Sequence, residues 1–439
     1  MQDLDAKESV PDVSLSECKG KENNLSSPSP ILSADHIFPD GGRQAWMTVL
    51  GGWLSFIAGI GLLSSFSVFQ SYYSLVTLSS YSADDISWIS STQTWGCFFF
   101  GIWAGRLSDR YGPSLPLAAG TFFMVFGTMM ASVSQKYYQF MLSQGVCTSF
   151  GIGLSFTPAL AVQSQWFLRK RGFVVGLVMS GQNVGGVIWP VIVNQLINYN
   201  GLSLGWTLRI IAFIQLFLMT LATLLIRPRF PRGSTKETIK ISVFIKDKRT
   251  VLFTIATFIM YLAIYIPYVF ITPYGMQWGA SATSAFYYAS ILNAGGFFGC
   301  YALGIIADAG WGFFDCLTVT AFASSIVGFA WMAARTPAGI IVWTVVYGVL
   351  SGALQAIFSP CISLLAPTPE VIGTWNGLCI SAISFAVLGS GPIAGRLLEN
   401  TGLTDYVPMQ AFTGACLMAA ASLFLITRIW VSQDFKKRI

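Results

Sequence analysis

A stretch without any charged side chain runs from Trp46 to Gln70: WMTVLGGWLSFIAGIGLLSSFSVFQ. An α-helix needs about 20 predominantly apolar residues to cross the hydrocarbon core of a bilayer, and this stretch is long enough to do so. A helix also satisfies its own backbone hydrogen bonds where there is no water to satisfy them. The stretch therefore predicts a transmembrane helix.

The composition of the whole chain supports a membrane protein. The 439 residues are 54% hydrophobic and only 10% charged, whereas soluble domains carry about 25% charged residues. So few charges cannot supply the polar shell of a soluble core. The net charge of +6 does not indicate a nucleic-acid partner, because the basic residues lie between the apolar stretches. The 8 cysteines form no CxxC pair, so no metal site or cofactor is expected.

Twelve apolar stretches of suitable length follow one another, separated by short polar, Gly or Pro breaks. The predicted spans are 46–70, 86–106, 114–134, 138–163, 172–194, 207–226, 250–273, 284–307, 314–334, 338–363, 372–394 and 409–431. The fold class that follows is an all-α membrane protein with twelve transmembrane helices.

The basic residues predict the orientation of the chain. Twelve spans put both termini on one side, and most of the 25 Lys and Arg residues fall on that side. Loops rich in Lys and Arg stay in the cytosol, so both termini are expected there. The predicted organisation is a disordered cytosolic tail (1–45), a six-helix bundle (46–226), a basic cytosolic linker (227–249), a second six-helix bundle (250–431) and a cytosolic C-terminal tail (432–439).

The two halves resemble each other at a nearly constant offset. Gly105 and Asp109 after the second span match Gly304 and Asp308 after the eighth. Two further matches fall in equivalent spans: Gly176-Leu177 with Gly377-Leu378, and Phe156-Thr157-Pro158 with Phe358-Ser359-Pro360. Two similar bundles suit alternating access, in which one bundle rocks against the other around a site near the midplane. Fold alone does not fix function.

The stretch 105–112, GRLSDRYG, resembles the signature between helices 2 and 3 of the major facilitator superfamily. Asp109 can pair with basic groups or with a facing helix N-terminus, and Gly105 and Gly112 allow close approach and a tight turn. An ordinary solvated turn is the alternative. The residues expected in this gating motif are Gly105, Asp109, Arg110, Gly112 and, in the second half, Asp308.

Two further stretches resemble the monocarboxylate porter family, and in particular its fungal branch. The first is 40–46, DGGRQAW, and the second is 166–172, WFLRKRG. The resemblance implies a twelve-helix transporter with cytosolic termini. The residues expected in the helix 5 motif are Arg169, Lys170, Arg171, Gly176, Gly181 and Gly185.

The sequence departs from that family where its animal lactate carriers hold a carboxylate. Those carriers use an Arg and an acidic residue in helix 8 and a Lys in helix 1. Alignment puts Cys300, Gly296 and Ser64 at these positions. Charged residues inside a membrane are costly and usually functional, so their absence here is informative. Because the residues that would bind a small carboxylate and its proton are missing, neither lactate nor pyruvate is predicted as substrate.

Uncharged polar residues inside the spans are the candidates for lining a substrate cavity. No Asp or Glu lies in the middle of a predicted span, and the single His, His36, lies in the tail. Protons are a candidate coupling ion, although no residue within the spans is an evident proton carrier. The candidates are Asn183, Tyr261, Tyr265, Tyr268, Asn293, Gln355 and Asn376, with Gln182 beside them. Interhelical hydrogen bonds and packing are the alternative roles. Such a cavity suits a neutral or amphipathic organic molecule.

Glycines along helix 5 predict a close crossing with helix 8 of the other half. Gly295, Gly296 and Gly299 are the expected partners there. This seam would slide during rocking, and plain packing is the alternative.

The sequence thus predicts a secondary transporter, not an enzyme, that moves a small organic molecule across a lipid bilayer. Efflux of a hydrophobic or amphipathic secondary metabolite is favoured. Uptake of a monocarboxylate or vitamin is one alternative, and a transporter-like sensor is another, although the C-terminal tail is short. A monomer or weak oligomer in the plasma membrane is expected. The sequence specifies neither the substrate nor the direction of transport.

Overall fold

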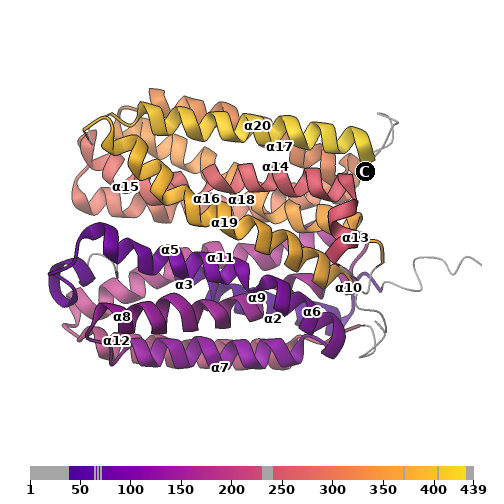
Figure 1. The fold of residues 1–439 in the computed structure, drawn as a ribbon, viewed down its shortest axis with the longest axis horizontal. Helices are drawn as coiled ribbons and strands as arrows, with labels where there is room; N and C mark the ends of the chain where they lie inside the picture. Colours follow the sequence, from indigo (N-terminus) through magenta and orange to yellow (C-terminus); the bar gives the residue numbers. More distant parts are fainter. Residues whose placement is uncertain are drawn as a thin grey trace, which may run out of the picture. The chain divides into compact units, whose positions relative to one another are not determined.

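The computed structural model describes residues 39–63, 66, 69, 72–229, 241–368, 371–402 and 405–431 (Figure 1). Residues 1–38 and 432–439 of the predicted tails and residues 230–240 of the linker lie outside these residues, whereas 39–45 are described and α2 begins at Arg43. Every regular element that the described residues form is helical. The helices of the first half are α2 (Arg43–Ala58), α3 (Ile60–Leu63), α5 (Ala83–Phe99), α6 (Gly101–Tyr111), α7 (Ser114–Ala131), α8 (Tyr137–Phe140), α9 (Ser149–Ala161), α10 (Gln163–Trp166), α11 (Arg171–Asn194) and α12 (Leu204–Leu225).

The second half follows the linker, of which the short helix α13 (Ile241–Lys246) is described. Its helices are α14 (Lys248–Ile264), α15 (Ile266–Gln277), α16 (Ala282–Ile306), α17 (Phe313–Ala330), α18 (Pro337–Leu365), α19 (Ile372–Glu399) and α20 (Val407–Val431). Short π-helical turns at Tyr73–Thr77, Met141–Thr148, Gln195–Tyr199 and Ala307–Trp311, and a 3-10 turn at Trp331–Ala333, complete the described elements.

Eleven helices in the described part of the chain are long and apolar enough to cross a membrane. The one predicted span not among these eleven is the second, 86–106. It is present as two shorter helices, α5 and α6, that meet at Phe100. Ser381 of α19, in the other half, forms hydrogen bonds with backbone groups at this break. Its hydroxyl donates to the Phe99 carbonyl over 2.7 Å and accepts from the Ile102 N–H over 2.9 Å. The second helix is therefore interrupted where a side chain of the opposite half enters its hydrogen-bond ladder.

The first membrane helix is broken at Gly59, between α2 and α3. A break leaves backbone carbonyls without their helical partners, and buried carbonyls need others. The indole of Trp189 donates to the Ile57 carbonyl (2.7 Å), and the amide of Gln215 donates to the Ala58 carbonyl (2.9 Å). The bend is thus held by side chains of α11 and α12.

The seventh membrane helix is broken at the equivalent place, where α14 ends at Ile264 and α15 begins at Ile266. Pro267 explains the break, because it has no N–H to donate and its ring clashes with the carbonyl four residues earlier. The hydroxyl of Tyr347 in α18 donates to the Ile264 carbonyl over 3.1 Å. Both halves therefore bend one helix and satisfy the bend with side chains.

Contacts between the two halves follow two helix pairs. The first-half helix α11 packs along α16, and the second-half helix α19 packs along α5 and α6. These helices are labelled in Figure 1. Each pair joins helices that the sequence repeat relates, so the two crossings are equivalent.

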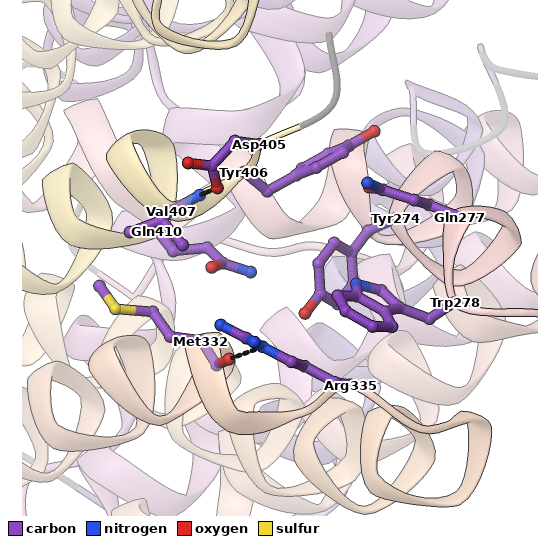
Figure 2. A pocket seen from close by; sticks show the side chains of 9 residues that line it. All are labelled: Tyr274, Gln277, Trp278, Met332, Arg335, Asp405, Tyr406, Val407 and Gln410. Carbon is purple, nitrogen blue, oxygen red and sulfur yellow. Dashed lines mark hydrogen bonds between the residues drawn. The ribbon is translucent and has the colours of Figure 1, made fainter. Parts of the chain in front are cut away.

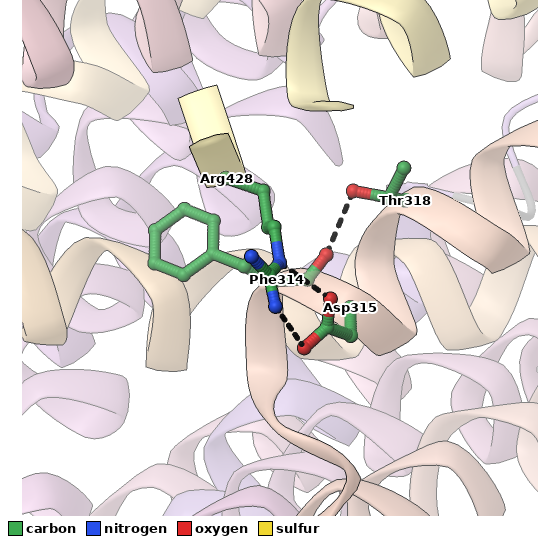
Figure 3. Close-up of polar contacts among 4 residues, drawn as sticks. All are labelled: Phe314, Asp315, Thr318 and Arg428. Carbon is green, nitrogen blue, oxygen red and sulfur yellow. Dashed lines mark hydrogen bonds and ion pairs between the residues drawn. The ribbon is translucent and has the colours of Figure 1, made fainter. Parts of the chain in front are cut away.

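A buried ion pair joins α17 to α20 inside the second half (Figure 3). The Arg428 Nε lies 2.7 Å from Asp315 Oδ1, and the Arg428 side chain is only 4% exposed. Removing Asp315, whose side chain is 30% exposed, would be strongly destabilising, because the Arg428 charge would stay buried after losing this carboxylate. The pair fixes the last membrane helix against the start of α17.

Candidate functional site

The carboxylate of Asp109, near the end of α6, caps a helix of the other half. Thr374 donates to Asp109 Oδ2 from both its backbone N–H (2.6 Å) and its hydroxyl (2.7 Å). The helix α19 begins at Ile372, so this N–H belongs to the first turn, whose donors lack helical partners. The positive end of the helix also favours a carboxylate. Asp109 therefore stabilises contact between the halves.

Asp308, in the second half, makes the equivalent contact with a helix of the first half. Its two oxygens accept the N–H groups of Gly172 (2.9 Å) and Phe173 (2.8 Å) in the first turn of α11. A third contact lies at the same end of the helices, where the hydroxyls of Ser164 and Ser363 are 3.3 Å apart. We call these three cross-half contacts the gate, and the end of the helices that holds them the gate end.

Glycines let the two halves approach closely at the gate. A Cβ at Gly105 would lie 2.2 Å from the Gly373 carbonyl oxygen, and a Cβ at Gly176 would lie 2.1 Å from the Cys300 oxygen. Any side chain at these positions would push α6 from α19, or α11 from α16. Gly112 has a different role, because it ends α6 with a φ of 83° that favours glycine.

The predicted glycine seam is correct only in part. Gly176 faces α16 as expected, but Gly181 and Gly185 face Trp53 and Gly61 of their own half. Of the expected partners, Gly295 and Gly299 pack against α18, and Gly296 meets the Asn183 amide. The helix period places glycines on a face, but it does not say which neighbour that face meets.

The two stretches that resemble the monocarboxylate porter family contact each other. Asp40 Oδ1 accepts the N–H groups of Leu168 (2.7 Å) and Arg169 (2.8 Å), in the loop that leads into α11. The buried Arg171 donates to the carbonyls of Phe167 (3.4 Å) and Ser164 (3.3 Å). This arrangement positions the start of α11, which carries the N–H groups that Asp308 accepts. The neighbouring basic side chains Arg169, Lys170 and Arg110 are exposed.

A polar cluster joins the two halves midway along the helices. The Gln182 amide of α11 and the Tyr265 hydroxyl both donate to Gln355 Oε1 of α18, each over 3.0 Å. The Gln355 Nε2 donates to the Ser351 carbonyl (3.3 Å), and the Tyr268 hydroxyl is 3.1 Å from Ser351 Oγ. We call these five residues the central polar cluster.

Aromatic rings lie next to this cluster and also bridge the halves. Phe98 of α5 packs against Tyr261 of α14, with ring centroids 5.8 Å apart, and against Phe156 of α9 at 5.7 Å. Tyr261 contacts Phe358 of α18 at 6.1 Å and Tyr265 at 5.8 Å. Three of these four ring pairs are edge-to-face, an arrangement that aromatic pairs prefer. We call Phe98, Phe156, Tyr261 and Phe358 the central aromatic cluster.

The structure places the three predicted asparagines elsewhere. Asn183 donates to the Cys300 thiol (3.2 Å), and Asn293 donates to the Ala289 carbonyl of its own helix (2.9 Å). Asn376 donates to the Ile372 carbonyl and accepts from the Ser359 hydroxyl, each over 3.0 Å. Asn183 and Asn376 thus make interhelical hydrogen bonds, which is their alternative role, whereas the Asn293 bond stays within its own helix. The predicted residues that the structure brings together are the three tyrosines, Gln355 and Gln182.

A small cavity lies at the end of α15 and the start of α20, which is the end of the second half opposite the gate. Figure 2 shows the side chains that line it. The side chains of Tyr274, Arg335 and Gln410 converge on it. Its volume of about 40 Å³ has room for a water molecule or two, whereas ligand pockets hold several hundred cubic ångströms. This cavity is therefore too small to hold an organic substrate.

Comparison with known proteins identifies the class. The sequence profile of the Major Facilitator Superfamily matches residues 44–378, and the chain belongs to this superfamily of membrane transporters. The crystal structure of the E. coli fucose:proton symporter has the same fold, with a TM-score of 0.68 at 16% identity over 87% of this chain and 98% of that one.

The more similar relatives are fungal transporters. The chain is 37% identical to the aspyridones efflux protein apdF of Emericella nidulans, over 91% of this chain and 80% of the relative. It is 39% identical to MFS-type transporter 1 of an Ophiocordyceps species, over 93% and 91%. It is 35% identical to the agnestins efflux protein AgnL12 of Paecilomyces divaricatus, over 88% of each chain.

Proposed function

We propose that this transporter exports a hydrophobic or amphipathic secondary metabolite by alternating access. The central polar cluster carries this proposal, because it joins both halves midway along the helices through uncharged groups only. The aromatic rings beside it add apolar walls. The names of the relatives, which include efflux proteins for aspyridones and agnestins, support the direction and the class of substrate.

The gate supports the alternating-access part of the proposal. The three gate contacts connect the first-half bundle, predicted at 46–226, to the second-half bundle, predicted at 250–431. We propose that the gate end faces the cytosol of a fungal plasma membrane, together with both termini. The described conformation is then closed toward the cytosol, and breaking the gate would admit the substrate.

The monocarboxylate uptake alternative has less support in the site. Cys300 and Gly296 stand where the lactate carriers of the monocarboxylate porter family hold charges. The Cys300 thiol donates to the Gly352 carbonyl (3.3 Å) and accepts from Asn183, so this position serves packing between α11, α16 and α18. We propose membership of the fungal branch of that family with a substrate that needs no buried countercharge.

A flux assay tests the proposal. Inside-out plasma-membrane vesicles from yeast that produce the protein are supplied with a panel of fungal metabolites, with and without a pH gradient. Energy-linked accumulation of an apolar metabolite inside the vesicles is the expected result, because it corresponds to export from cells. The double variant Gln182→Met, Gln355→Met removes the polar contact between the halves and should reduce this flux. Movement of small carboxylates alone, and out of preloaded vesicles, would support uptake, and absence of flux for every compound would support a sensor.

A further inference from the structure

Two hydrogen-bond donors from opposite halves converge on one oxygen. The Gln182 Nε2 of the first half and the Tyr265 hydroxyl of the second both lie 3.0 Å from Gln355 Oε1. The other end of the Gln355 amide is held by the Ser351 carbonyl one turn earlier, which directs the oxygen toward the two donors. An amide oxygen has two lone pairs for such bonds. The arrangement is therefore a site for one carbonyl-type acceptor, filled here by the chain itself.

We propose that a substrate carbonyl oxygen replaces Gln355 Oε1 between Gln182 and Tyr265. This inference rests on the proposed transport function and specifies its substrate class: a flat, neutral, apolar molecule that presents a ketone, amide or lactam oxygen. The substrate then bridges the halves as Gln355 does in the described conformation. Gln355 acts as a placeholder that keeps two buried donors satisfied between transport cycles.

The aromatic rings around the two donors favour a substrate with a flat ring system. Tyr265 contacts the rings of Tyr261 and Tyr268 edge-on, each at 5.8 Å, and Tyr261 contacts Phe98 from the other half. Gln182 and Tyr261 are buried, with 7% and 1% of their surface exposed. Once the halves separate, these rings can present their faces and edges to a planar molecule, as aromatic pairs do to each other.

The chemistry of the site favours a neutral acceptor over a carboxylate. Both donors are uncharged, and the hydroxyl and amide groups of the central polar cluster are neutral as well. A buried carboxylate needs a positive partner to offset its lost hydration, and these five residues supply none. A neutral carbonyl needs only the two donors that the site offers.

A matched ligand pair tests the proposal by direct binding to the purified full-length protein in detergent. The probes are 9-fluorenone and fluorene, two flat tricyclic molecules in which a carbonyl replaces a methylene. Binding is followed by the shift in thermal stability and by isothermal titration. We expect the unaltered protein to bind 9-fluorenone about ten-fold more tightly than fluorene, since one or two hydrogen bonds separate them.

Three variants separate the roles of the three residues. Gln182→Met and Tyr265→Phe each remove one donor with little change of shape, and should weaken 9-fluorenone binding by about ten-fold. Gln355→Met removes the placeholder and frees both donors, so it should strengthen 9-fluorenone binding. Fluorene binding should change little in all three. Tyr274→Phe, at the far end of the second half, is the matched tyrosine control.

The sign of the Gln355 effect decides the outcome. If Gln355→Met weakens 9-fluorenone binding as the donor variants do, or if fluorene binds as well as 9-fluorenone, the proposal is wrong. Size-exclusion profiles verify that each variant folds. Binding and flux are measured separately, so a protein that binds 9-fluorenone as expected but exports no metabolite would contradict the proposed function and leave the acceptor site intact.

Discussion

At the scale of single residues, two carboxylates make equivalent contacts between the two halves of the molecule. Asp109 and Asp308 each accept hydrogen bonds from the first turn of a helix in the opposite half. Hydrogen bonds to a charged group stabilise by about 1.5–3 kcal/mol each. Because both contacts exist only while the halves touch at the gate end, they stabilise one conformation of the transporter rather than the fold as a whole.

Removing a gate carboxylate should therefore open the gate. Asp109→Ala leaves two donors of Thr374 without their acceptor, and should shift the closed–open equilibrium toward open by roughly ten-fold or more. A reporter cysteine at the buried position Ser164 should then react faster with an impermeant maleimide added from the gate side.

The control for this experiment is Asp85→Ala. Asp85 also takes part in a helix cap, but its partner Ser82 belongs to the same helix end in the first half. Its loss should leave labelling at position 164 unchanged. Equal labelling rates in Asp109→Ala and the unaltered protein would show that the carboxylate does not hold the gate.

Some of these residues could be identified from sequence and others could not. Gly105, Asp109 and Asp308 were evident because they form a repeated, spaced motif at a helix end. Phe98 gave no signal, because the chain has 34 phenylalanines and none stands out by type. Phe156 and Phe358 did occur in a repeat match, which pairs the two rings that pack at equivalent places in the central aromatic cluster.

At the scale of elements, close glycine contacts set the spacing of the crossing helices. The α11–α16 crossing leaves no space for a Cβ at Gly176. Gly176→Ala should therefore separate these helices and reduce the transport rate several-fold, without preventing membrane insertion. The vesicle flux assay, normalised to the amount of protein, measures this. Gly395→Ala on α19 is the matched control, since nothing lies within 4 Å of a Cβ there, and an equal loss in both variants would contradict the argument.

The broken second helix gives a separate test. Ser381 satisfies both the Phe99 carbonyl and the Ile102 N–H, so Ser381→Ala leaves two buried backbone groups unsatisfied. We expect a loss of about 1–3 kcal/mol in the free energy of unfolding, seen as a lower melting temperature in detergent. Ser390→Ala on the same helix removes a hydroxyl that bonds only to its own helix and should have a smaller effect. A melting temperature that stays constant in Ser381→Ala would exclude this role.

The breaks themselves were beyond sequence analysis, for a physical reason. The sequence analysis predicts a continuous span at 250–273, and nothing in the span 86–106 predicts the break at Phe100. That break depends on a hydroxyl of α19, which is distant in the sequence. The same limit applies to Asn183, Asn293 and Asn376, for which cavity lining and interhelical hydrogen bonds both stay open from sequence, since a helix period gives the face of a residue and not its neighbour.

At the scale of the whole molecule, one assumption connects the gate with the central clusters: the halves separate at the gate end during each cycle. The Ser164 and Ser363 hydroxyls, 3.3 Å apart from opposite halves, allow this to be tested. The double variant Ser164→Cys, Ser363→Cys brings two thiols together there. A disulfide or a short thiol cross-linker would join the halves in the closed conformation.

Metabolite flux through this double variant, before and after cross-linking, is the most direct measurement. We predict that the reduced protein transports, that oxidation abolishes flux, and that a reducing agent restores it, while each single variant is insensitive to the oxidant. Full flux through the cross-linked protein would show that the gate end need not open, and would contradict alternating access through this gate.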